Sequence, residues 1–443
     1  MISRLWMRQF KAFESCDLEL RPLTVFLGEN NSGKSSILAA IRLLAQTVQG
    51  QDQTIPLALS GVFGDFGSYK DLVHGNHRGR PIRLGITVSG IGPRRKAVET
   101  YFETEFKHRA QTRDTIIRWT DIGEVSDNHY QTLLRAATSR DSGKLTIETV
   151  QGHPVAETAR ATVSRHLRMY NFLPRVWPEY PSSQSRSPDV NAAQSLMFDG
   201  NRRIRHAFDD ALRSLRSVEY LGAMRRAPER TYVNTGVAGR NIGADGAGWP
   251  SMLALESPRR RVIGNAITHW TQSAGIADRV TVSWLTDRHY EIVVTNSVTG
   301  ETENIADVGQ GTSQVLPVIV GGSRLRSGDI FIVEEPEIHL HPRAQAALGD
   351  FFSELVGAGV QSIVETHSEY LLLRLQQSIA SGAIDPASIV FYYVRATPSA
   401  KEVDKLTLDS SASFRDQLPG GFFPQRVEEA RALARARGTR TTQ

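Results

Sequence analysis

The sequence predicts an α/β fold, and three observations lead to that prediction. A glycine-rich loop, residues 28–36, follows a strand-like run and opens a helical one. Residues 329–366 pass from strand to helix to strand in their apolar pattern. Between these two halves, residues 96–215 are polar, rich in arginine and helical in pattern. We therefore expect a mixed sheet built from both halves, with a mostly helical insertion and a small C-terminal element.

The individual elements follow from local patterns of apolar and turn residues. Strands are expected at residues 3–13, 18–27, 81–89, 218–221, 280–285, 290–295, 329–333 and 361–366. Helices are expected at 34–46, after the glycine turn in 308–317, at 342–355 and at 425–437. The predicted organisation has four parts, which are the first half of the α/β domain at 1–95, the insertion at 96–215, the second half at 216–400 and the C-terminal element at 401–443.

The composition excludes several classes of protein. Of the 443 residues, 40% are hydrophobic and 22% are charged, which is typical of globular chains. The single cysteine, Cys16, excludes an intrachain disulfide framework and a cysteine-cluster metal site. No apolar run reaches the length of a membrane-spanning helix, and the first residues lack a signal peptide's apolar core. We expect a cytoplasmic protein with no membrane partner.

Positive charge is concentrated in one stretch of the chain. The formal net charge is +5, and residues 160–230 contain thirteen arginines against seven acidic residues. Tyr170, Phe172, Trp177 and Tyr180 lie among these arginines. Arginines bind phosphate backbones and aromatic rings stack on bases, so this stretch is a possible DNA-binding site. A solvated basic face, or one that docks an acidic partner, is the alternative.

The glycine-rich loop matches a phosphate-binding pattern. It reads GENNSGKSS and fits G-x-x-x-x-G-K-[ST], in which backbone N–H groups surround phosphate oxygens. We expect Lys34 to reach the β- and γ-phosphates and the Ser35 hydroxyl to bind Mg²⁺. A chance match is the alternative, and the flanking strand and helix disfavour it. The predicted cofactors are ATP and Mg²⁺, and the predicted ATP-binding residues are Gly28, Asn30, Asn31, Ser32, Gly33, Lys34, Ser35 and Ser36.

Two adjacent carboxylates, Glu334 and Glu335, follow the predicted strand at 329–333. Ligands bind at the carboxyl ends of strands in open α/β sheets. Hydrolysis of a nucleotide requires a carboxylate near the metal and another that deprotonates the attacking water, and we assign these roles to Glu334 and Glu335 respectively. A surface strand that ends in exposed glutamates is the alternative. His367 follows the next strand and is predicted to contact the γ-phosphate in catalysis. A structural histidine is the alternative.

Together these motifs resemble the ABC-type ATPase heads of the RecF/SMC/OLD group, in the branch of AAA family ATPases. The phosphate loop is similar to their Walker A motif. The other similar segments are LWMRQFKAF (5–13), YLGAMRRAPER (220–230), the Walker B motif FIVEEPEIHLHP (331–342), the switch-histidine motif VETHSE (364–369) and GFFPQR (421–426). Glu334 departs from the family's usual aspartate. The insertion carries none of the resemblance, and no Toprim nuclease pattern follows Ser368.

The resemblance also implies a signature turn and a dimer. VGQGTSQVLP, residues 308–317, stands where the ABC signature belongs, although it reads GQGTSQ rather than S-G-G-Q. In such ATPases two heads close head-to-tail, and each site is completed by the partner's signature. We therefore expect a homodimer or higher homo-oligomer. The signature residues expected to bind the partner's nucleotide are Gly309, Gly311, Thr312 and Ser313.

The resemblance implies a biological role as well. ATPases of this branch accompany separately encoded effectors in bacterial anti-phage systems such as Septu, PARIS and retron loci. We therefore expect an ATPase subunit that controls a nuclease-type effector protein. The alternative is a RecF-like DNA repair ATPase that binds DNA through residues 160–230. A transporter subunit is disfavoured, because the motifs depart from transporter signatures.

Overall fold

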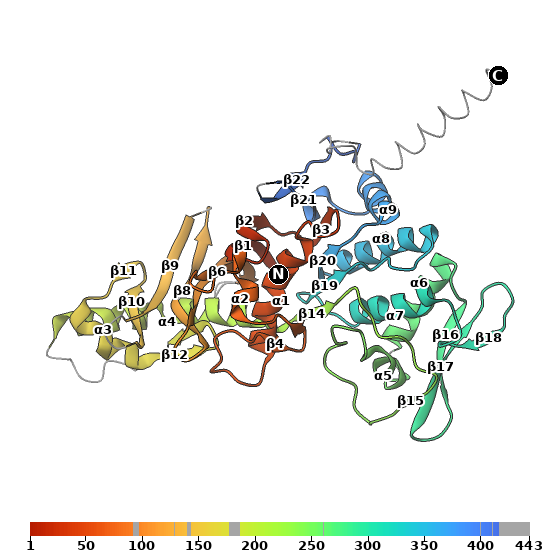
Figure 1. Ribbon diagram of the computed structural model, residues 1–443, viewed down its shortest axis with the longest axis horizontal. Helices are drawn as coiled ribbons and strands as arrows, with labels where there is room; N and C mark the ends of the chain where they lie inside the picture. The colour runs from red at the N-terminus through yellow and green to blue at the C-terminus, as the bar shows by residue number, and fades with distance from the viewer. Residues whose placement is uncertain are drawn as a thin grey trace, which may run out of the picture.

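The computed structural model describes residues 1–91, 97–127, 129–139, 143–176, 187–259, 261–398, 400–409 and 411–415. Two large sheets dominate it, and the helices of the second half of the chain lie beyond the smaller sheet (Figure 1). The predicted α/β class is confirmed. The predicted helix at 425–437 lies outside the described residues.

The six-stranded central sheet joins the two ends of the sequence. Its strands, in spatial order, are β14 (Val218–Leu221), β19 (Ile330–Glu334), β20 (Gln361–Glu365), β3 (Leu23–Gly28), β21 (Ile389–Ala396) and β22 (Lys401–Leu406). Every pair is parallel except β21 with β22. Because parallel strands end at the same edge, the carboxyl ends of β3, β19 and β20 lie together.

The eight-stranded sheet is antiparallel throughout. Its strands, in spatial order, are β11 (His153–Pro154), β10 (Leu145–Val150), β9 (His129–Thr138), β8 (Asp114–Ser126), β7 (Ala97–Arg109), β6 (Ile82–Ile91), β1 (Ile2–Phe10) and β2 (Phe13–Glu19). The predicted boundary at residue 95 therefore falls between two paired strands, β6 and β7.

The prediction of a mostly helical insertion at 96–215 was wrong. Strands occupy most of the described residues from 97 to 154. The α-helices of this segment, α3 (Glu157–Val163) and α4 (Pro188–Arg216), come after them. Phe102, Thr104 and Phe106 are buried at every second position of β7, which is the period of a strand. The charged residues between them mask this alternation in the sequence.

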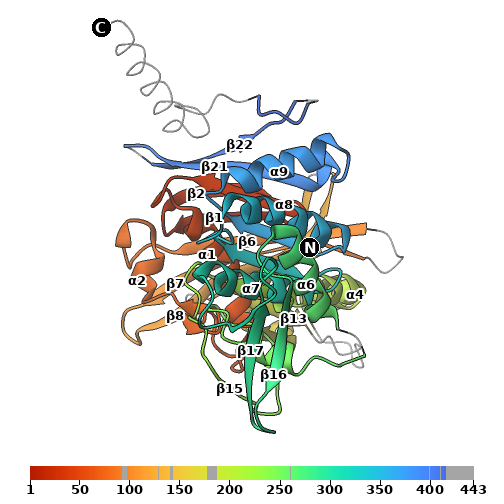
Figure 2. The ribbon, with the colours of Figure 1, turned by 90° about the vertical axis from the view of Figure 1, so that its right-hand side faces the viewer.

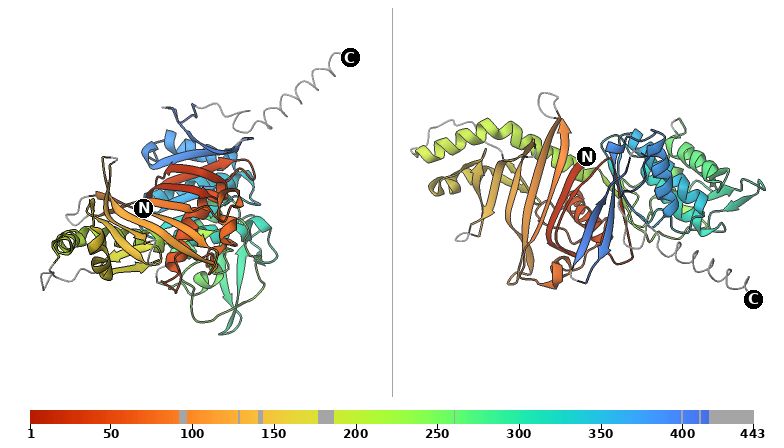
Figure 3. Two further views of the ribbon diagram at one scale, coloured as in Figure 1. Left: turned by 60° about the vertical axis from the view of Figure 1, so that its left-hand side comes forward. Right: turned by 90° about the horizontal axis from the view of Figure 1, so that it is seen from above.

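Two hydrophobic cores lie on opposite faces of the central sheet. The first packs α1 (Lys34–Gln49) and α4 against the eight-stranded sheet, along which α4 runs (Figure 3). The second core contains the hairpin of β16 (Arg279–Trp284) and β17 (His289–Thr295) with five helices (Figure 2). These helices are α5 (Trp249–Ala254), α6 (Val262–Ala274), α7 (Gln310–Ser323), α8 (Pro342–Gly357) and α9 (Glu369–Ala380).

Short elements complete the described chain. They are β4 (Ser60–Gly61), β5 (Gly64–Asp65), α2 (Tyr69–Leu72), η1 (His74–Asn76), η2 (Ser164–His166), β12 (Leu167–Tyr170), β13 (Leu173–Val176), β15 (Tyr232–Val233), β18 (Thr302–Asn304) and η3 (Pro386–Ser388). None of the helices in the described ranges combines the length and hydrophobicity needed to cross a membrane.

Candidate functional site

The predicted phosphate loop connects β3, in the middle of the central sheet, to the first turn of α1. Gly28 has φ +140°, and a Cβ there would lie 2.0 Å from the Val394 carbonyl oxygen of β21. Gly33 has φ +114° and faces Ala12 and Phe13. Position 28 requires glycine for its positive φ and for the close approach of the β21 backbone, and position 33 requires it for its positive φ. The loop therefore has the conformation that the motif predicts.

Lys34 is buried at the start of α1, with 3% of its surface exposed. Its ammonium donates to the carbonyl oxygens of Gly28 and Glu29, at 2.9 and 2.8 Å, and lies 3.8 Å from the Glu365 carboxylate. Burial lowers the pKa of Lys34, and the nearby Glu365 and Glu335 carboxylates oppose that shift. The loop thus holds a cation at its centre.

Glu365, at the end of β20, is a site residue that the motif analysis missed. The Ser35 hydroxyl donates to both of its carboxylate oxygens, at 3.1 and 3.2 Å. Burial and the nearby Glu334 carboxylate raise the pKa of Glu365 to about 7, against the effect of Lys34. An acidic residue that ends a buried strand, two positions before a predicted catalytic histidine, is the signal that would have found it.

Glu335 and His367 lie beside Glu365, as the motif order predicts. Ligand atoms of these three side chains lie within 4.8 Å of one another. Glu335 has φ +44°, and its N–H donates to the Glu365 carbonyl oxygen at 2.7 Å. The His367 N–H donates to the buried Glu337 carboxylate at 2.6 Å. Burial lowers the pKa of His367, and the positive charge of Lys34 lowers it further. A neutral imidazole is therefore favoured near pH 7.

Glu334 points its carboxylate at a different set of partners. It accepts hydrogen bonds from Arg42 at 3.0 Å and from the Tyr220 hydroxyl at 3.1 Å. The Arg42 guanidinium also lies 3.7 Å from the centre of the Tyr220 ring. Burial raises the pKa of Glu334, and Arg42 opposes that shift. The predicted metal ligand is thus engaged by a cation, whereas Glu365 holds the serine of the phosphate loop.

Arg225 connects the turn after β19 to the predicted signature helix. Its guanidinium donates to the carbonyl oxygens of Glu334, Glu335 and Gln314, at 2.8, 2.9 and 3.0 Å. Burial lowers its pKa to about 10. Residues 220–230 resemble a family segment in sequence, but this resemblance gave Arg225 no role, because the partners of Arg225 are backbone atoms.

The predicted signature turn begins α7, with Gly309 exposed at its start. Thr312 and Ser313 bond locally, to the carbonyl oxygens of Gly309 and Gln310. A Cβ at Gly311 would lie 2.6 Å from the His339 carbonyl oxygen. Contacts within the chain therefore already require glycine at this position. Within the described residues, no hydrogen bond or ion pair joins this turn to the phosphate loop of the same chain.

The other predicted loop residues differ in exposure. Asn30 and Asn31 are exposed, Ser36 is half-buried, and Ser32 is 1% exposed. The Ser32 hydroxyl has no hydrogen-bond partner among the described residues. The loop offers an unpaired buried hydroxyl and a central cation, and the clustered carboxylates lie beside it. Mg²⁺ and a nucleoside triphosphate require groups of these kinds. The residues present therefore fit ATP with Mg²⁺.

The basic stretch at 160–230 does not form a single open surface. Arg225 is buried at the site, and Arg203 donates to Glu124 at 3.0 Å. Phe172 is fully buried, and Tyr170 packs edge-on against Phe208. The expectation that Phe172 stacks on bases was wrong, because the ring fills the first core. Trp177 and Tyr180 lie outside the described residues.

One sequence comparison decides the family. The profile of the family described as "AAA domain, putative AbiEii toxin, Type IV TA system" matches residues 23–374. The chain belongs to this family. The match runs from β3 into α9, so it includes the phosphate loop, both carboxylate-bearing strand ends and His367. The AAA-domain family places the chain among the P-loop ATPases, and no curated protein matches it in sequence.

Solved structures similar to the AAA-domain chain include several SMC heads. The SMC head domain from Thermotoga maritima has a TM-score of 0.40 and 10% identity, over 92% of this chain and 99% of that one. An SMC head bound to the C-winged helix domain of ScpA has a TM-score of 0.40 and 10% identity, over 93% and 98%. An SMC head from Pyrococcus furiosus, bound to the C-terminal domain of ScpA, has a TM-score of 0.39 and 9% identity, over 92% and 96%.

Proposed function

We propose that this chain is a cytoplasmic, ATP-hydrolysing subunit of the ABC type, whose ATP-driven dimerisation controls a separately encoded, nuclease-type effector in bacterial anti-phage defence. The observation that carries the ATPase proposal is the cluster of Lys34, Ser35, Glu335, Glu365 and His367 at one sheet edge. The family's description as a putative toxin of a toxin–antitoxin system supports the defence role.

We assign a role in the proposed hydrolysis to each side chain of the cluster. A water oxygen attacks the γ-phosphorus, its proton passes to Glu335, and the bond from that phosphorus to the oxygen of ADP breaks. Lys34 and His367 contact the γ-phosphate as negative charge develops. Bound Mg²⁺ supplies further neutralisation of the phosphates. Ser35 would hold it together with a carboxylate, either Glu334 from the motif or Glu365, which the contact with Ser35 favours.

The position of the signature turn supports the proposed dimerisation. Gly309 is exposed at the start of α7, where the N–H groups of a helix start attract phosphate. We propose that residues Gly309, Gly311, Thr312 and Ser313 complete the site of a second copy. ATP should therefore bring two chains together, with the turn of each chain on the other's nucleotide.

Sedimentation of the Glu335→Gln variant tests the dimer. Because this variant should bind ATP without turning it over, ATP with Mg²⁺ should shift it from monomer to dimer, while ADP should not. Adding Gly309→Arg, which places a bulky cation at the exposed start of the turn where a side chain meets no neighbour, should abolish the shift but leave nucleotide binding intact. Two results together would remove the support for ATP-driven closure. They are association of the variant that does not depend on ATP, and wild-type ATP turnover that rises linearly with protein concentration. Co-purification with a nuclease encoded by a neighbouring gene tests separately whether the chain binds an effector.

A further inference from the structure

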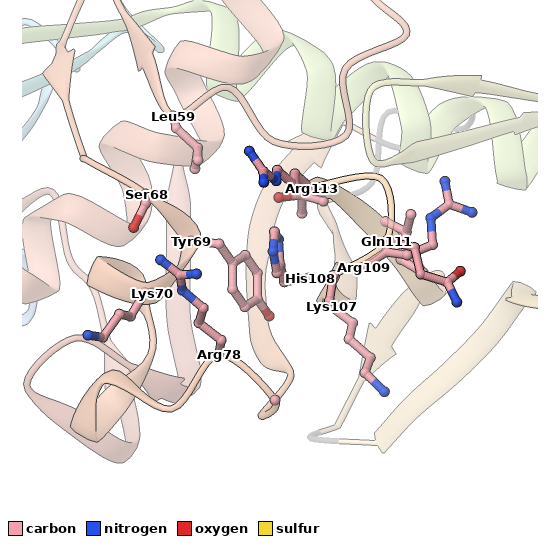
Figure 4. A pocket seen from close by; sticks show the side chains of 14 residues that line it. Leu59, Ser68, Tyr69, Lys70, Arg78, Lys107, His108, Arg109, Gln111 and Arg113 are labelled. Carbon is pink, nitrogen blue, oxygen red and sulfur yellow. The ribbon is translucent and has the colours of Figure 1, made fainter.

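A positively charged cleft lies away from the phosphate loop, between the segment around α2 and the hairpin of β7 and β8. Its volume is about 900 Å³. Lys70 and Arg78 project from one wall, and Lys107, Arg109 and Arg113 from the other (Figure 4). None of the described residues that line it is acidic. Five basic residues therefore line one solvent-accessible space.

Most of these cations have no partner among the residues that the structure describes. Within the described part of the chain, the side chains of Lys70, Arg78, Lys107 and Arg113 form no hydrogen bond or ion pair. Arg109 alone is paired, with Asp114 at 2.7 Å on the exposed hairpin. Unpaired cations on the facing walls of a cleft concentrate positive potential and attract polyanions. The cleft thus has the charge of a site for a ligand with several anionic groups.

The aromatic side chains of the cleft point to the kind of polyanion. Tyr69 is 3% exposed, and its hydroxyl donates to the Phe106 carbonyl oxygen at 2.8 Å. Its ring stacks on His108, with centroids 5.6 Å apart. Tyr69 therefore offers neither a stacking face for a base nor an anchor pocket of the kind that dominates protein interfaces. Binding here would therefore rest on the cations, which contact phosphates without reading bases.

We propose that this cleft binds the phosphodiester backbone of a nucleic acid, without reading its bases. The site is separate from the arginine-rich stretch at 160–230, none of whose described residues lines the cleft. It therefore adds a ligand to the proposed ATPase.

A short path connects the cleft to the phosphate loop. The Lys11 N–H, in the turn between β1 and β2, donates to the Leu72 carbonyl oxygen of α2 at 2.6 Å. The next residues, Ala12 and Phe13, face Gly33. A bound nucleic acid that displaces α2 would therefore also displace the turn between β1 and β2, which packs on the phosphate loop. We infer that nucleic acid in the cleft changes the rate of ATP hydrolysis, and this second step, unlike the binding, rests on the proposed function.

Fluorescence anisotropy with labelled duplex and single-stranded oligonucleotides tests the binding. The variant is Lys70→Ala, Arg78→Ala, Lys107→Ala and Arg113→Ala together. Its matched control removes four exposed arginines from the basic stretch, Arg165→Ala, Arg202→Ala, Arg205→Ala and Arg213→Ala. The cleft variant should bind about tenfold or more weakly, and the slope of log affinity against log salt should fall by roughly 3. The control should bind like the wild type.

Each other result overturns a stated part. Unchanged binding by the cleft variant, or loss only in the control, rejects the cleft and favours α4. Binding of poly-glutamate but of neither oligonucleotide shows an acidic protein ligand instead. Basal ATP turnover should be equal in wild type and cleft variant, and only the wild type should respond to the oligonucleotide. Binding without any such response rejects the coupling alone.

Discussion

The Ser35 hydroxyl donates to both oxygens of the Glu365 carboxylate, at 3.1 and 3.2 Å, although 330 positions separate the two residues. The contact exists because β3 and β20 are adjacent parallel strands, with Glu365 opposite Phe26. It brings a carboxylate to the hydroxyl that is predicted to bind Mg²⁺. The Glu334 carboxylate, by contrast, accepts hydrogen bonds from Arg42 and Tyr220.

The first prediction concerns which carboxylate serves the metal. Glu365→Gln should raise the Mg²⁺ concentration needed for half-maximal ATP binding by roughly tenfold, because a ligand or its close support is lost. Titration of a fluorescent ATP analogue at several Mg²⁺ concentrations measures this without turnover. Glu334→Gln is the comparison and should shift the Mg²⁺ requirement less. The reverse order would assign the metal to Glu334.

The second prediction concerns Lys34. Lys34→Met keeps most of the side-chain volume and removes the cation, so the affinity for ATP should fall by about tenfold or more. The melting temperature should stay close to that of the wild type, because burial already opposes the charge. Isothermal titration and thermal unfolding measure both quantities. Equal affinity in the two proteins would show that ATP does not lie against Lys34.

The third prediction concerns Arg225, which we regard as a positioning residue. Arg225→Met removes the donors to the backbone of Glu334, Glu335 and Gln314. Turnover should fall by about tenfold, because the general base Glu335 is displaced. The affinity for ATP should change little, because the phosphate loop is not displaced. Arg226→Met is the matched control, since Arg226 is exposed and pairs with Asp245. Equal turnover in both variants would contradict this role.

The fourth prediction concerns the pH dependence of stability. Asp121, in β8, accepts hydrogen bonds from Tyr101 and Thr132, and burial raises its pKa to about 6. The unfolded chain loses this proton near its ordinary pKa of 3.8, whereas the folded protein keeps it to about pH 6. Stability should therefore fall as pH rises from about 4 to 6, by roughly 2–3 kcal/mol from this group.

Asp121→Asn isolates that contribution, because an amide does not titrate. The difference in free energy of unfolding between variant and wild type, measured by denaturant titration, should move in favour of the variant between pH 4 and 6. It should then stay constant above about pH 7. A difference that does not vary with pH would exclude Asp121 as the source.

The features that local sequence could predict are those determined by contiguous residues. The loop at 28–36 and the strand before Glu334 and Glu335 were predicted because their residue types are required within one turn or strand. Glu365 ends a buried strand two positions before His367, which marks it as a candidate, but its contact with Ser35 depends on the register of β20 against β3, which the sequence does not give. Its neighbour His367 was predicted only through strand order.

The strands between residues 97 and 150 were missed for a different reason. Their inward positions alternate large apolar residues with threonines, as in Phe102, Thr104 and Phe106. Thr104 bonds Thr120 across the neighbouring strand at 2.9 Å, so a polar residue is satisfied inside the sheet. In the sequence such positions look polar. Pairing over long antiparallel strands overrides that appearance, and only the structure shows it.

The most direct test is ATP turnover by Glu335→Gln, measured beside ATP binding on the same preparation. Glu335 lies with Glu365 and His367 in the cluster, and we assign it as the base. Turnover should fall by about a hundredfold or more while ATP binds as tightly as to the wild type. Wild-type turnover in this variant would contradict the account, because the water would then be activated by another group.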